Sequence, residues 1–311
     1  MFSGGRSRFD RSCGNELIGS DQIARVVKEE TWDWRSFRGL QDVKVSPFIK
    51  WAGGKGQLLE YMKFPARFGT YHEPFLGGGA TFFGLQPPSA FLSDVNEELT
   101  NAYRVVKENV EDLITSLKQL AADYSEEEFY NIRAQDPSWL ESVDRAARFI
   151  FLNKTCYNGL YRVNRKGKFN VPFGRYKAPR ICDPDSLRSA SEVLQHAIVK
   201  ARDFRDALKL VEPGDFVYLD PPYVPVSKTS NFTEYTSKSF TWFDHEALAE
   251  EAVRLRDEVR CFVLVSNSYQ AKVKSLYERL GFRIQHVAAQ RVIGSSKASR
   301  GRINELLIRN Y

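Results

Sequence analysis

Cysteines and long apolar runs are both scarce in this chain of 311 residues. The four cysteines lie far apart, without the close pairs that mark a zinc site or a disulfide framework, so we expect plain thiols and no metal centre. No uninterrupted apolar stretch approaches the roughly 18 residues of a membrane span, and the N-terminus is too charged for a secretory signal. These absences predict a cytoplasmic protein with no membrane partner.

A strong excess of one charge is missing as well. The chain carries 45 lysines and arginines against 39 aspartates and glutamates, and a net charge of +6 is common among proteins that bind nothing acidic. Hydrophobic residues make up 42% and charged residues 27%, which is typical of a soluble globular protein with a full core. The partners of the protein must therefore be inferred from where the charges lie rather than from their sum.

The sequence Asp220-Pro221-Pro222-Tyr223 directly follows the apolar run 216–219. Proline cannot donate a hydrogen bond to a neighbouring strand, so the strand must end there, with an acidic and an aromatic side chain on a stiff turn. In an open α/β sheet, ligands bind at this carboxyl edge. Taken alone, the motif indicates either an ordinary strand terminator or a chemical site, and the rest of the chain has to distinguish the two.

Two glycine turns precede this motif. The first, residues 53–56, holds Lys55 and leads into a predicted helix from Gln57. It lacks the spaced first glycine and the Ser or Thr of a phosphate-binding loop, so a nucleoside triphosphate is not favoured and the lysine can meet a carboxylate instead. The second turn, residues 77–79, follows a predicted strand at 71–75 and opens another predicted helix. Its glycines allow a ligand to approach the backbone closely.

Acidic side chains flank the second glycine turn. Glu73 precedes it, and a further apolar run delivers Asp94 about 20 residues later, the separation expected between a nucleoside-binding loop and its ribose-binding carboxylate. Phe82 stands where the dinucleotide fingerprint has its third glycine, and Glu73 would repel a pyrophosphate. A ligand with positive charge, such as the sulfonium and ammonium of S-adenosylmethionine (SAM), fits better, although a glycine turn without a ligand stays an alternative. Asp203 and Phe204, after another predicted strand, offer an acceptor and a ring for an adenine.

Between Asn153 and Arg180 the chain has eight basic residues and no acidic one, interleaved with tyrosines and phenylalanines. Residues 163–169 are typical of a hairpin with a basic tip. Basic side chains neutralise phosphates, while Tyr, Asn and Arg stack on bases or bond to their edges. The mixture therefore favours nucleic-acid binding over a solvated basic face.

Strands that alternate with helices predict an α/β fold with a doubly wound, mostly parallel sheet and an antiparallel pair at its end. An apolar stripe that runs from a cap at Asn96 to Leu120, followed by helical patterns at 126–135 and 142–154, predicts a helical segment between the strands. This segment is too long for a single crossover, so we expect it to form a lobe.

Three parts are therefore expected. Residues 1–46, which begin rich in Gly, Ser and Arg, form an N-terminal extension to which the sequence assigns no role. Residues 47–100 and 197–311 form a cofactor-binding catalytic domain, and residues 101–196 form a smaller helical and hairpin lobe. A basic loop at 294–302 is a further candidate for phosphate contact.

Taken in order, these motifs resemble those of the Dam-type DNA adenine N6-methyltransferases, the D12 or α-ordered class. The resemblance covers about residues 47–311. The stretches that carry it are FIKWAGGK (48–55), EPFLGGG (73–79), LSDVN (92–96), NGLYR (158–162), FNVPFGRYK (169–177), DPPY (220–223), NFT (231–233), SN (266–267) and ELL (305–307). It implies a Rossmann-like, SAM-dependent methyltransferase sheet with a DNA target-recognition lobe.

The resemblance also implies roles for particular residues. The catalytic motif is Asp220, Pro221, Pro222 and Tyr223. The residues expected to bind SAM are Trp51, Lys55, Glu73, Phe75, Gly77, Gly79, Asp94, Asp203, Phe204 and Asp220. Those expected to contact DNA are Lys50, Tyr157, Asn158, Leu160, Arg162, Asn164, Pro172 and Arg175.

Several of these DNA contacts imply a particular target. Lys50 matches the lysine that touches the first guanine of the family's site, and Arg162 and Pro172 match residues that read its other half. Residues 157–160 include the group that matches the family's insertion beside a flipped adenine. The resemblance therefore implies methylation of adenine N6 within GATC in double-stranded DNA. The extension before Pro47 departs from the compact family members.

In the mechanism that the resemblance implies, Tyr223 stacks on the flipped adenine while the Asp220 carboxylate and the Pro221 carbonyl accept hydrogen bonds from N6. Neither a metal nor a covalent enzyme intermediate is needed. Two alternatives stay open: adenine methylation in another sequence, and a SAM-binding nucleic-acid-binding protein without turnover. Also open are the oligomeric state and whether the protein acts alone or beside a cognate restriction endonuclease in a bacterial or phage-infected cell.

Overall fold

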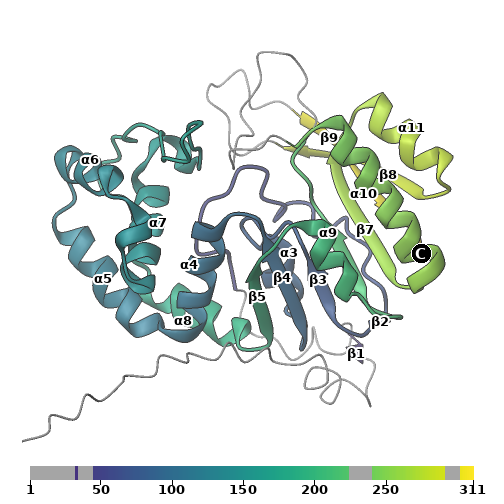
Figure 1. Cartoon of the computed structure of the whole chain (residues 1–311), viewed down its shortest axis with the longest axis horizontal. Coiled ribbons are helices and arrows are strands. Elements are labelled where there is room, and N and C mark those ends of the chain that lie inside the picture. Colours follow the sequence, from purple (N-terminus) through teal and green to yellow (C-terminus); the bar gives the residue numbers. More distant parts are fainter. Residues whose placement is uncertain (1–31, 34–44, 224–239, 291–301) are drawn as a thin grey trace, which may run out of the picture. The chain divides into compact units, whose positions relative to one another are not determined.

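The computed structural model describes residues 32–33, 45–223, 240–290 and 302–311 (Figure 1). A seven-stranded sheet has the order β5-β4-β3-β6-β7-β9-β8. Its strands are β3 (Tyr71–Glu73), β4 (Ala90–Asp94), β5 (Ala197–Ala201), β6 (Phe216–Leu219), β7 (Phe262–Ser268), β8 (Arg283–Gln290) and β9 (Arg302–Arg309). A separate antiparallel pair joins β1 (Trp32–Asp33) to β2 (Arg67–Phe68).

The sheet is parallel from β5 to β7 and antiparallel at its other edge. Strands β5, β4, β3, β6 and β7 are paired in parallel, whereas β9 pairs antiparallel with both β7 and β8. All four residues of β6 are buried, because a parallel strand covered on both faces has no side toward solvent. The predicted mostly parallel sheet with an antiparallel end is confirmed.

Two apolar clusters fill the space on either side of the sheet. Phe216 and Tyr218 belong to one cluster, and Val217 and Leu219 belong to the other. Successive side chains of a strand point to opposite faces, so β6 contributes alternately to the two clusters. Strands β3, β5, β6 and β7 are each followed along the chain by a helix, namely α3 (Ala80–Leu85), α9 (Phe204–Ala207), α10 (Trp242–Arg254) and α11 (Ala271–Arg279).

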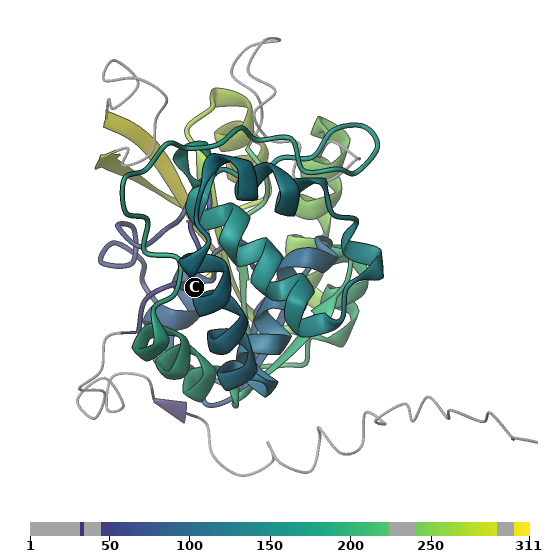
Figure 2. The ribbon, with the colours of Figure 1, turned by 90° about the vertical axis from the view of Figure 1, so that its left-hand side faces the viewer.

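A group of helices lies beside the β5 edge of the sheet, at the left of Figure 1 and toward the viewer in Figure 2. It comprises α4 (Glu97–Glu108), α5 (Val110–Ala122), α6 (Glu126–Ala134), α7 (Ser142–Thr155) and α8 (Pro184–Leu194). The Asn96 side chain caps α4 by accepting a hydrogen bond from the Leu99 amide at 3.2 Å, as predicted. The helices predicted at 126–135 and 142–154 are confirmed by α6 and α7.

Short helical turns complete the described secondary structure. They lie at Pro137–Trp139, Tyr157–Gly159, Leu208–Leu210 and, as a π turn, Leu255–Val259. The predicted apolar stripe from Leu99 to Leu120 is divided between α4 and α5 at Asn109. The φ of −137° and ψ of 43° at Asn109 are not helical, so the chain bends there and the stripe continues on a second axis.

The helix predicted from Gln57 is wrong. Residues 56–61 form successive turns instead, in which the Leu58 amide donates to the Lys55 carbonyl at 2.8 Å. Pro65 follows within a few residues, and so short a segment cannot offset the cost of nucleating a helix. Burial of Leu58 and a few neighbouring apolar side chains holds the turns in place.

The basic hairpin is confirmed, because Val163 forms an antiparallel bridge with Phe169. The motif at 231–233, most of the loop at 294–302 and most of the N-terminal extension lie outside the described residues. The division of the chain into domains stays a prediction. Among the described helices, none is long and apolar enough to cross a membrane.

Candidate active site

The carboxyl ends of neighbouring parallel strands bring three carboxylates to one edge of the sheet. Strand β3 ends at Glu73, β4 ends at Asp94, and Asp220 directly follows β6. Burial is the main cause that raises the pKa of Glu73 well above its ordinary value, and repulsion by Asp220 and Asp94 adds to it. Burial also raises the pKa of Asp94 to about 6. This concentration of acidic groups favours a positively charged ligand.

Asp220 is bound through both of its carboxylate oxygens. Its Oδ2 accepts a hydrogen bond from Lys55 Nζ at 2.8 Å, and its Oδ1 accepts one from the Ser266 hydroxyl at 2.7 Å. The Lys55 side chain is only 5% exposed and also donates to the Gly53 carbonyl at 2.6 Å. The expectation that Lys55 meets a carboxylate is confirmed. The first glycine turn thus places a buried cation beside the Asp-Pro-Pro-Tyr motif and fixes the orientation of Asp220.

Tyr223 is held at its hydroxyl and against one face of its ring. The hydroxyl donates to Glu305 Oε2 at 2.7 Å, and Lys55 Nζ lies 4.8 Å from the ring centroid. Burial, together with the charges of Asp220 and Glu305, raises the pKa of Tyr223 well above its ordinary value. The phenol therefore stays neutral at physiological pH and can stack on an uncharged base.

The second glycine turn is built around Trp51. Gly77 has a φ of +47°, and a Cβ at this position would lie 2.7 Å from Trp51 Cδ1, so only glycine allows the indole to lie there. The Gly77 amide donates to Asp94 Oδ2 at 3.1 Å, and the Tyr103 hydroxyl donates to the Gly77 carbonyl at 3.1 Å. Gly79 follows with a φ of +64° and opens α3. The turn, its carboxylate and the indole form one unit.

An aromatic group lies next to this unit. The rings of Phe75 and Phe204 are 5.3 Å apart, and Phe240 lies 5.8 Å from the first and 5.9 Å from the second. The Asp203 carboxylate begins α9 by accepting a hydrogen bond from the Arg205 amide at 2.9 Å. Its side chain remains 44% exposed, so it can also accept a hydrogen bond from a ligand. Two of the predicted cofactor residues are thus in ring contact, with a third at the adjoining helix terminus.

Lys50 and Trp51 connect this edge of the sheet to the basic segment. Trp51 stacks on Tyr161 with 5.7 Å between ring centroids and an angle of 21°. Lys50 Nζ lies 4.8 Å from the centroid of Tyr176. The Asn153 side chain accepts from the Lys50 amide at 2.8 Å and donates to the Lys50 carbonyl at 2.7 Å. The predicted DNA-contacting lysine and the predicted cofactor-binding tryptophan are therefore positioned by the same lobe.

The hairpin holds two of the predicted DNA contacts in different ways. Arg162 Nε donates to Asn170 Oδ1 at 2.7 Å, and this hydrogen bond orients the guanidinium. The Asn164 side-chain oxygen accepts from the amides of Lys166 at 2.9 Å and Lys168 at 3.1 Å. Asn164 therefore closes the hairpin turn, a structural role that the sequence did not indicate.

The remaining predicted DNA contacts lie on either side of the hairpin. Asn158 and Arg175 have φ values of 56° and 54°, a left-handed conformation that costs a non-glycine residue roughly 1 kcal/mol. The Tyr157 amide donates to the Pro172 carbonyl at 2.9 Å, and the Tyr157 side chain is 42% exposed. Leu160 packs partly buried against the core. The lobe therefore brings the two segments together and leaves an aromatic ring at the surface.

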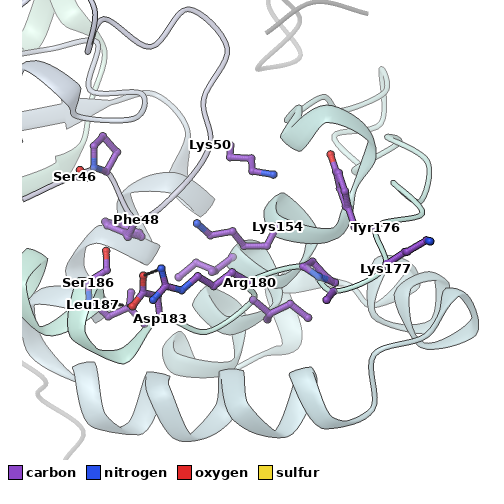
Figure 3. Close-up of a pocket in the computed structure, with 15 residues that line it drawn as sticks. Ser46, Phe48, Lys50, Lys154, Tyr176, Lys177, Arg180, Asp183, Ser186 and Leu187 are labelled. Atoms are coloured by element: carbon purple, nitrogen blue, oxygen red, sulfur yellow. Dashed lines mark hydrogen bonds and ion pairs between the residues drawn. The ribbon is translucent and has the colours of Figure 1, made fainter. Parts of the chain in front are cut away.

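A basic pocket of about 510 Å³ lies between α7, α8, the chain that precedes α8 and the segment 46–50 (Figure 3). Lys50, Lys154, Lys177 and Arg180 line it, together with one acidic side chain, Asp183, which pairs with Arg180 at 3.2 Å. Lys154 is half-buried and makes no hydrogen bond or ion pair with the described residues. Burial and the nearby Lys50 lower the pKa of Lys154 to about 8. Such a cation favours an anionic group in the pocket.

The sequence alone does not predict the roles of four residues in these sites. Ser266 and Glu305 stand in stretches that carry the family resemblance, but nothing in the sequence says which group each side chain binds. Tyr161 and Lys154 belong to the basic aromatic segment, whose pattern assigns no individual role to either residue. Ser266, Glu305 and Tyr161 contact residues that are distant in the chain, and Lys154 lines a pocket with the equally distant Lys50, so only the folded arrangement identifies these roles.

The site and the fold define the class of protein. Residues 51–293 match the family model of the D12 class N6 adenine-specific DNA methyltransferases. The chain belongs to this family, and it is therefore an adenine-N6 DNA methyltransferase with an α/β, Rossmann-like fold. The family resemblance inferred from the motifs is confirmed. Among the described residues, no group of three His, Cys, Asp or Glu side chains is arranged to hold a metal ion.

Some relatives of this chain are named type II methyltransferases, and others are named DNA adenine methylases. The type II methyltransferase M1.LlaDCHI of Lactococcus lactis subsp. cremoris is 41% identical over 277 residues, covering 86% of this chain and 96% of that protein. The type II methyltransferase M.MjaIII of Methanocaldococcus jannaschii is 41% identical over 292 residues, covering 86% and 100%. The DNA adenine methylase of Escherichia coli K12 is 34% identical over 263 residues, covering 84% and 93%.

Proposed function

We propose that this protein transfers the methyl group of SAM to N6 of a flipped adenine within GATC in double-stranded DNA. The observation that carries the proposal is the turn at the end of β6. There, Lys55 and Ser266 fix the Asp220 carboxylate, and Tyr223 follows on the same rigid segment. One turn thus offers both an acceptor for an exocyclic amino group and a ring for the base that carries it.

The residues around the second glycine turn fit SAM. The carboxylates of Asp220 and Asp94 repel that of Glu73, and the cationic sulfonium and ammonium groups would relieve this repulsion. Gly77 allows a ligand close to the backbone, and the Phe75 ring offers an apolar surface for an adenine. When bound, SAM supplies an electrophilic methyl group on a positively charged sulfur.

The residues of the chain orient the reacting nitrogen. An adenine must leave the duplex to reach this site, at a cost of a few kcal/mol, and Tyr223 stacks on the flipped base. Asp220 and the Pro221 carbonyl accept hydrogen bonds from the amino group, which turns the nitrogen lone pair out of the ring plane. The Asp220 carboxylate also stabilises the positive charge that develops on N6. Orientation and electrostatics together account for the catalysis.

The proposal is tested with purified protein, labelled SAM and an unmethylated duplex that contains GATC. Label is expected on N6 of adenine. Label on cytosine, or transfer to RNA alone, contradicts the proposal, and SAM binding without any transfer identifies a binding protein instead. Sequencing of DNA from cells that express the protein reports the modified base and its motif together, which separates GATC from another target sequence.

Replacing Arg162 by alanine is expected to relax discrimination at one half of the target. Asn170 orients the guanidinium, and an arginine that reads a guanine contributes about 1–3 kcal/mol of discrimination against the wrong base. The measurement compares kcat/KM on GATC with that on duplexes changed at one base pair. The ratio between cognate and changed duplexes is expected to fall at one position only.

The matched control is Arg165→Ala, which removes an exposed arginine from the tip of the same hairpin. This variant is expected to weaken binding to all duplexes by a similar factor, as loss of a phosphate contact does. If Arg162→Ala behaves in the same way as Arg165→Ala, Arg162 contacts phosphate and not a base.

Replacing Lys154 by glutamine is expected to weaken DNA binding by about tenfold at low salt, because the basic pocket loses its half-buried cation as a phosphate ligand. The slope of log K against log salt is expected to fall by about 1. Since the pKa of Lys154 is lowered to about 8, wild-type affinity is expected to decline as pH rises through 8, and the variant lacks this decline. Fluorescence anisotropy of a labelled duplex measures all three.

Lys118→Gln is the matched control, because it removes the same charge from an exposed position on α5. Its salt slope and pH dependence are expected to equal those of the wild type. A Lys154→Gln variant with an unchanged slope would show that no phosphate occupies the pocket.

The biological setting is part of the proposal. Similarity to two proteins named type II methyltransferases supports a role beside a cognate restriction endonuclease. We place this role in the cytoplasm of a bacterial or phage-infected cell. Expression of the protein is then expected to protect plasmid DNA from an endonuclease that cleaves unmethylated GATC. Cleavage that continues at every GATC would show that the protein does not methylate this sequence.

A further inference from the structure

A buried carboxylate on the last strand accepts a hydrogen bond from the turn formed by residues 220–223. Glu305 lies on β9, is only 5% exposed, and its Oε2 accepts a hydrogen bond from the Tyr223 hydroxyl at 2.7 Å. Burial of a carboxylate is costly unless hydrogen bonds compensate for the lost water. An apolar side chain at this position would avoid that cost. The Glu305 carboxylate therefore does more than fill space in the core, and one of the groups it binds is the Tyr223 hydroxyl.

The same pair of strands holds the other end of the turn. On β7, Ser266 donates to Asp220 Oδ1 at 2.7 Å, and two residues further on, Ser268 is the register partner of Glu305 on β9. Residues two apart on a strand face the same side of the sheet. The antiparallel strands β7 and β9 therefore bind both functional groups of the turn. Ser266 on β7 binds the Asp220 carboxylate, and Glu305 on β9 binds the Tyr223 hydroxyl.

These contacts fix the plane of the Tyr223 ring. The hydroxyl is anchored by Glu305, and Lys55 Nζ lies over one ring face at 4.8 Å from the centroid. Lys55 is itself held by its ion pair with Asp220 at 2.8 Å. The phenol oxygen lies on the line of the Cβ–Cγ bond, so its hydrogen bond to Glu305 fixes the direction of the long axis of the ring. The Lys55 contact covers one ring face and opposes rotation about that axis, so a base is accepted on the opposite face.

We propose that Glu305 is a positioning residue that sets the angle at which Tyr223 stacks on the target adenine. The inference rests on the proposed function, because it assumes that a flipped base reaches Tyr223. Glu305 itself touches neither the base nor the cofactor in this scheme. We expect Glu305 to act on the base through the Tyr223 hydroxyl, and this expectation can be tested by removing each group in turn.

The test is a double-mutant cycle in the full-length protein with Glu305→Ala, Tyr223→Phe and both changes together. Each single change is expected to lower the single-turnover rate constant for methyl transfer to a GATC duplex by about tenfold to 100-fold. Misplacing a reacting group by about 1 Å has an effect of this size. Affinity for DNA is expected to stay at the wild-type value. The double variant is expected to lose no more than the worse single variant.

Additional variants separate positioning from damage to the fold. Glu305→Gln keeps an oxygen that accepts from Tyr223 and is expected to recover most of the activity. Tyr277→Phe removes another buried phenol, on α11, without touching the turn and is expected to have wild-type kcat. Thermal unfolding of each variant verifies that it is folded at the assay temperature.

A fluorescent readout follows the base directly. With 2-aminopurine in place of the target adenine, stacking on Tyr223 is expected to quench the base in the wild-type complex and to quench it less in Glu305→Ala. Additive losses in the cycle, or wild-type kcat in Glu305→Ala, overturn the inference while leaving the proposed function intact. Failure of the wild-type protein to methylate any adenine overturns the proposed function instead.

Discussion

Replacing Asp220 by alanine is expected to lower kcat for methyl transfer by about 100-fold to 1,000-fold, the usual effect of removing a group that stabilises charge in the transition state. The variant keeps both prolines and Tyr223, so the base can still stack, but its amino group has lost the charged acceptor. Single-turnover transfer of labelled methyl groups to a GATC duplex measures the effect. Affinity for the duplex is expected to change little, because a carboxylate repels DNA phosphates and does not bind them.

Stability must be measured alongside this activity. The alanine leaves the Lys55 cation buried without its ion-pair partner, a change that destabilises folded proteins by about 3–5 kcal/mol. Asp220→Asn keeps an oxygen for the amino group and keeps the volume, so its kcat is expected to lie between those of the alanine variant and the wild type. Asp206→Ala, which breaks an exposed pair with Lys209, is the control for carboxylate loss as such. A folded Asp220→Ala protein with wild-type kcat would contradict the mechanism.

Replacing Gly77 by alanine is expected to weaken SAM binding at least about tenfold. The φ of +47° disfavours any side chain by about 1–2 kcal/mol, and the new Cβ would lie 2.7 Å from Trp51 Cδ1. The indole must move, and with it the turn that binds Asp94. Calorimetric titration with SAM measures the affinity, and thermal unfolding measures the accompanying loss of stability.

Gly56→Ala is the matched control, because a Cβ at that glycine has nothing within 4 Å and no left-handed φ. Its affinity for SAM and its melting temperature are expected to equal those of the wild type. An unchanged affinity in folded Gly77→Ala would show that the second glycine turn and Trp51 lie outside the cofactor pocket, and the proposed assignment of both would have to be abandoned.

The local signals in the sequence identified most of the strands and the glycine turns. Strand β6 could be predicted because four apolar residues end at two prolines, and α4 because Asn96 caps an apolar stripe. The turns at 56–61 and the break at Asn109 could not, since periodicity records which residues are apolar and not where the chain bends. In both places the packing of the surrounding core overrides the local pattern.

In the candidate site, too, the sequence predicts some features and only the folded structure determines the others. The sequence identified Asp220 and Tyr223 as acid and ring, because the chemistry of a residue and its place after a strand are local properties. It could not say that Lys55 pairs with Asp220 across 165 residues, or that Glu305 binds Tyr223 across 82. Those contacts depend on the order of strands in the sheet and on register. The sequence alone thus determines which residues form the turn at 220–223. Only the tertiary structure determines that Ser266 on β7 and Glu305 on β9 bind this turn, because a hydrogen bond between distant residues forms only after the core has placed both groups.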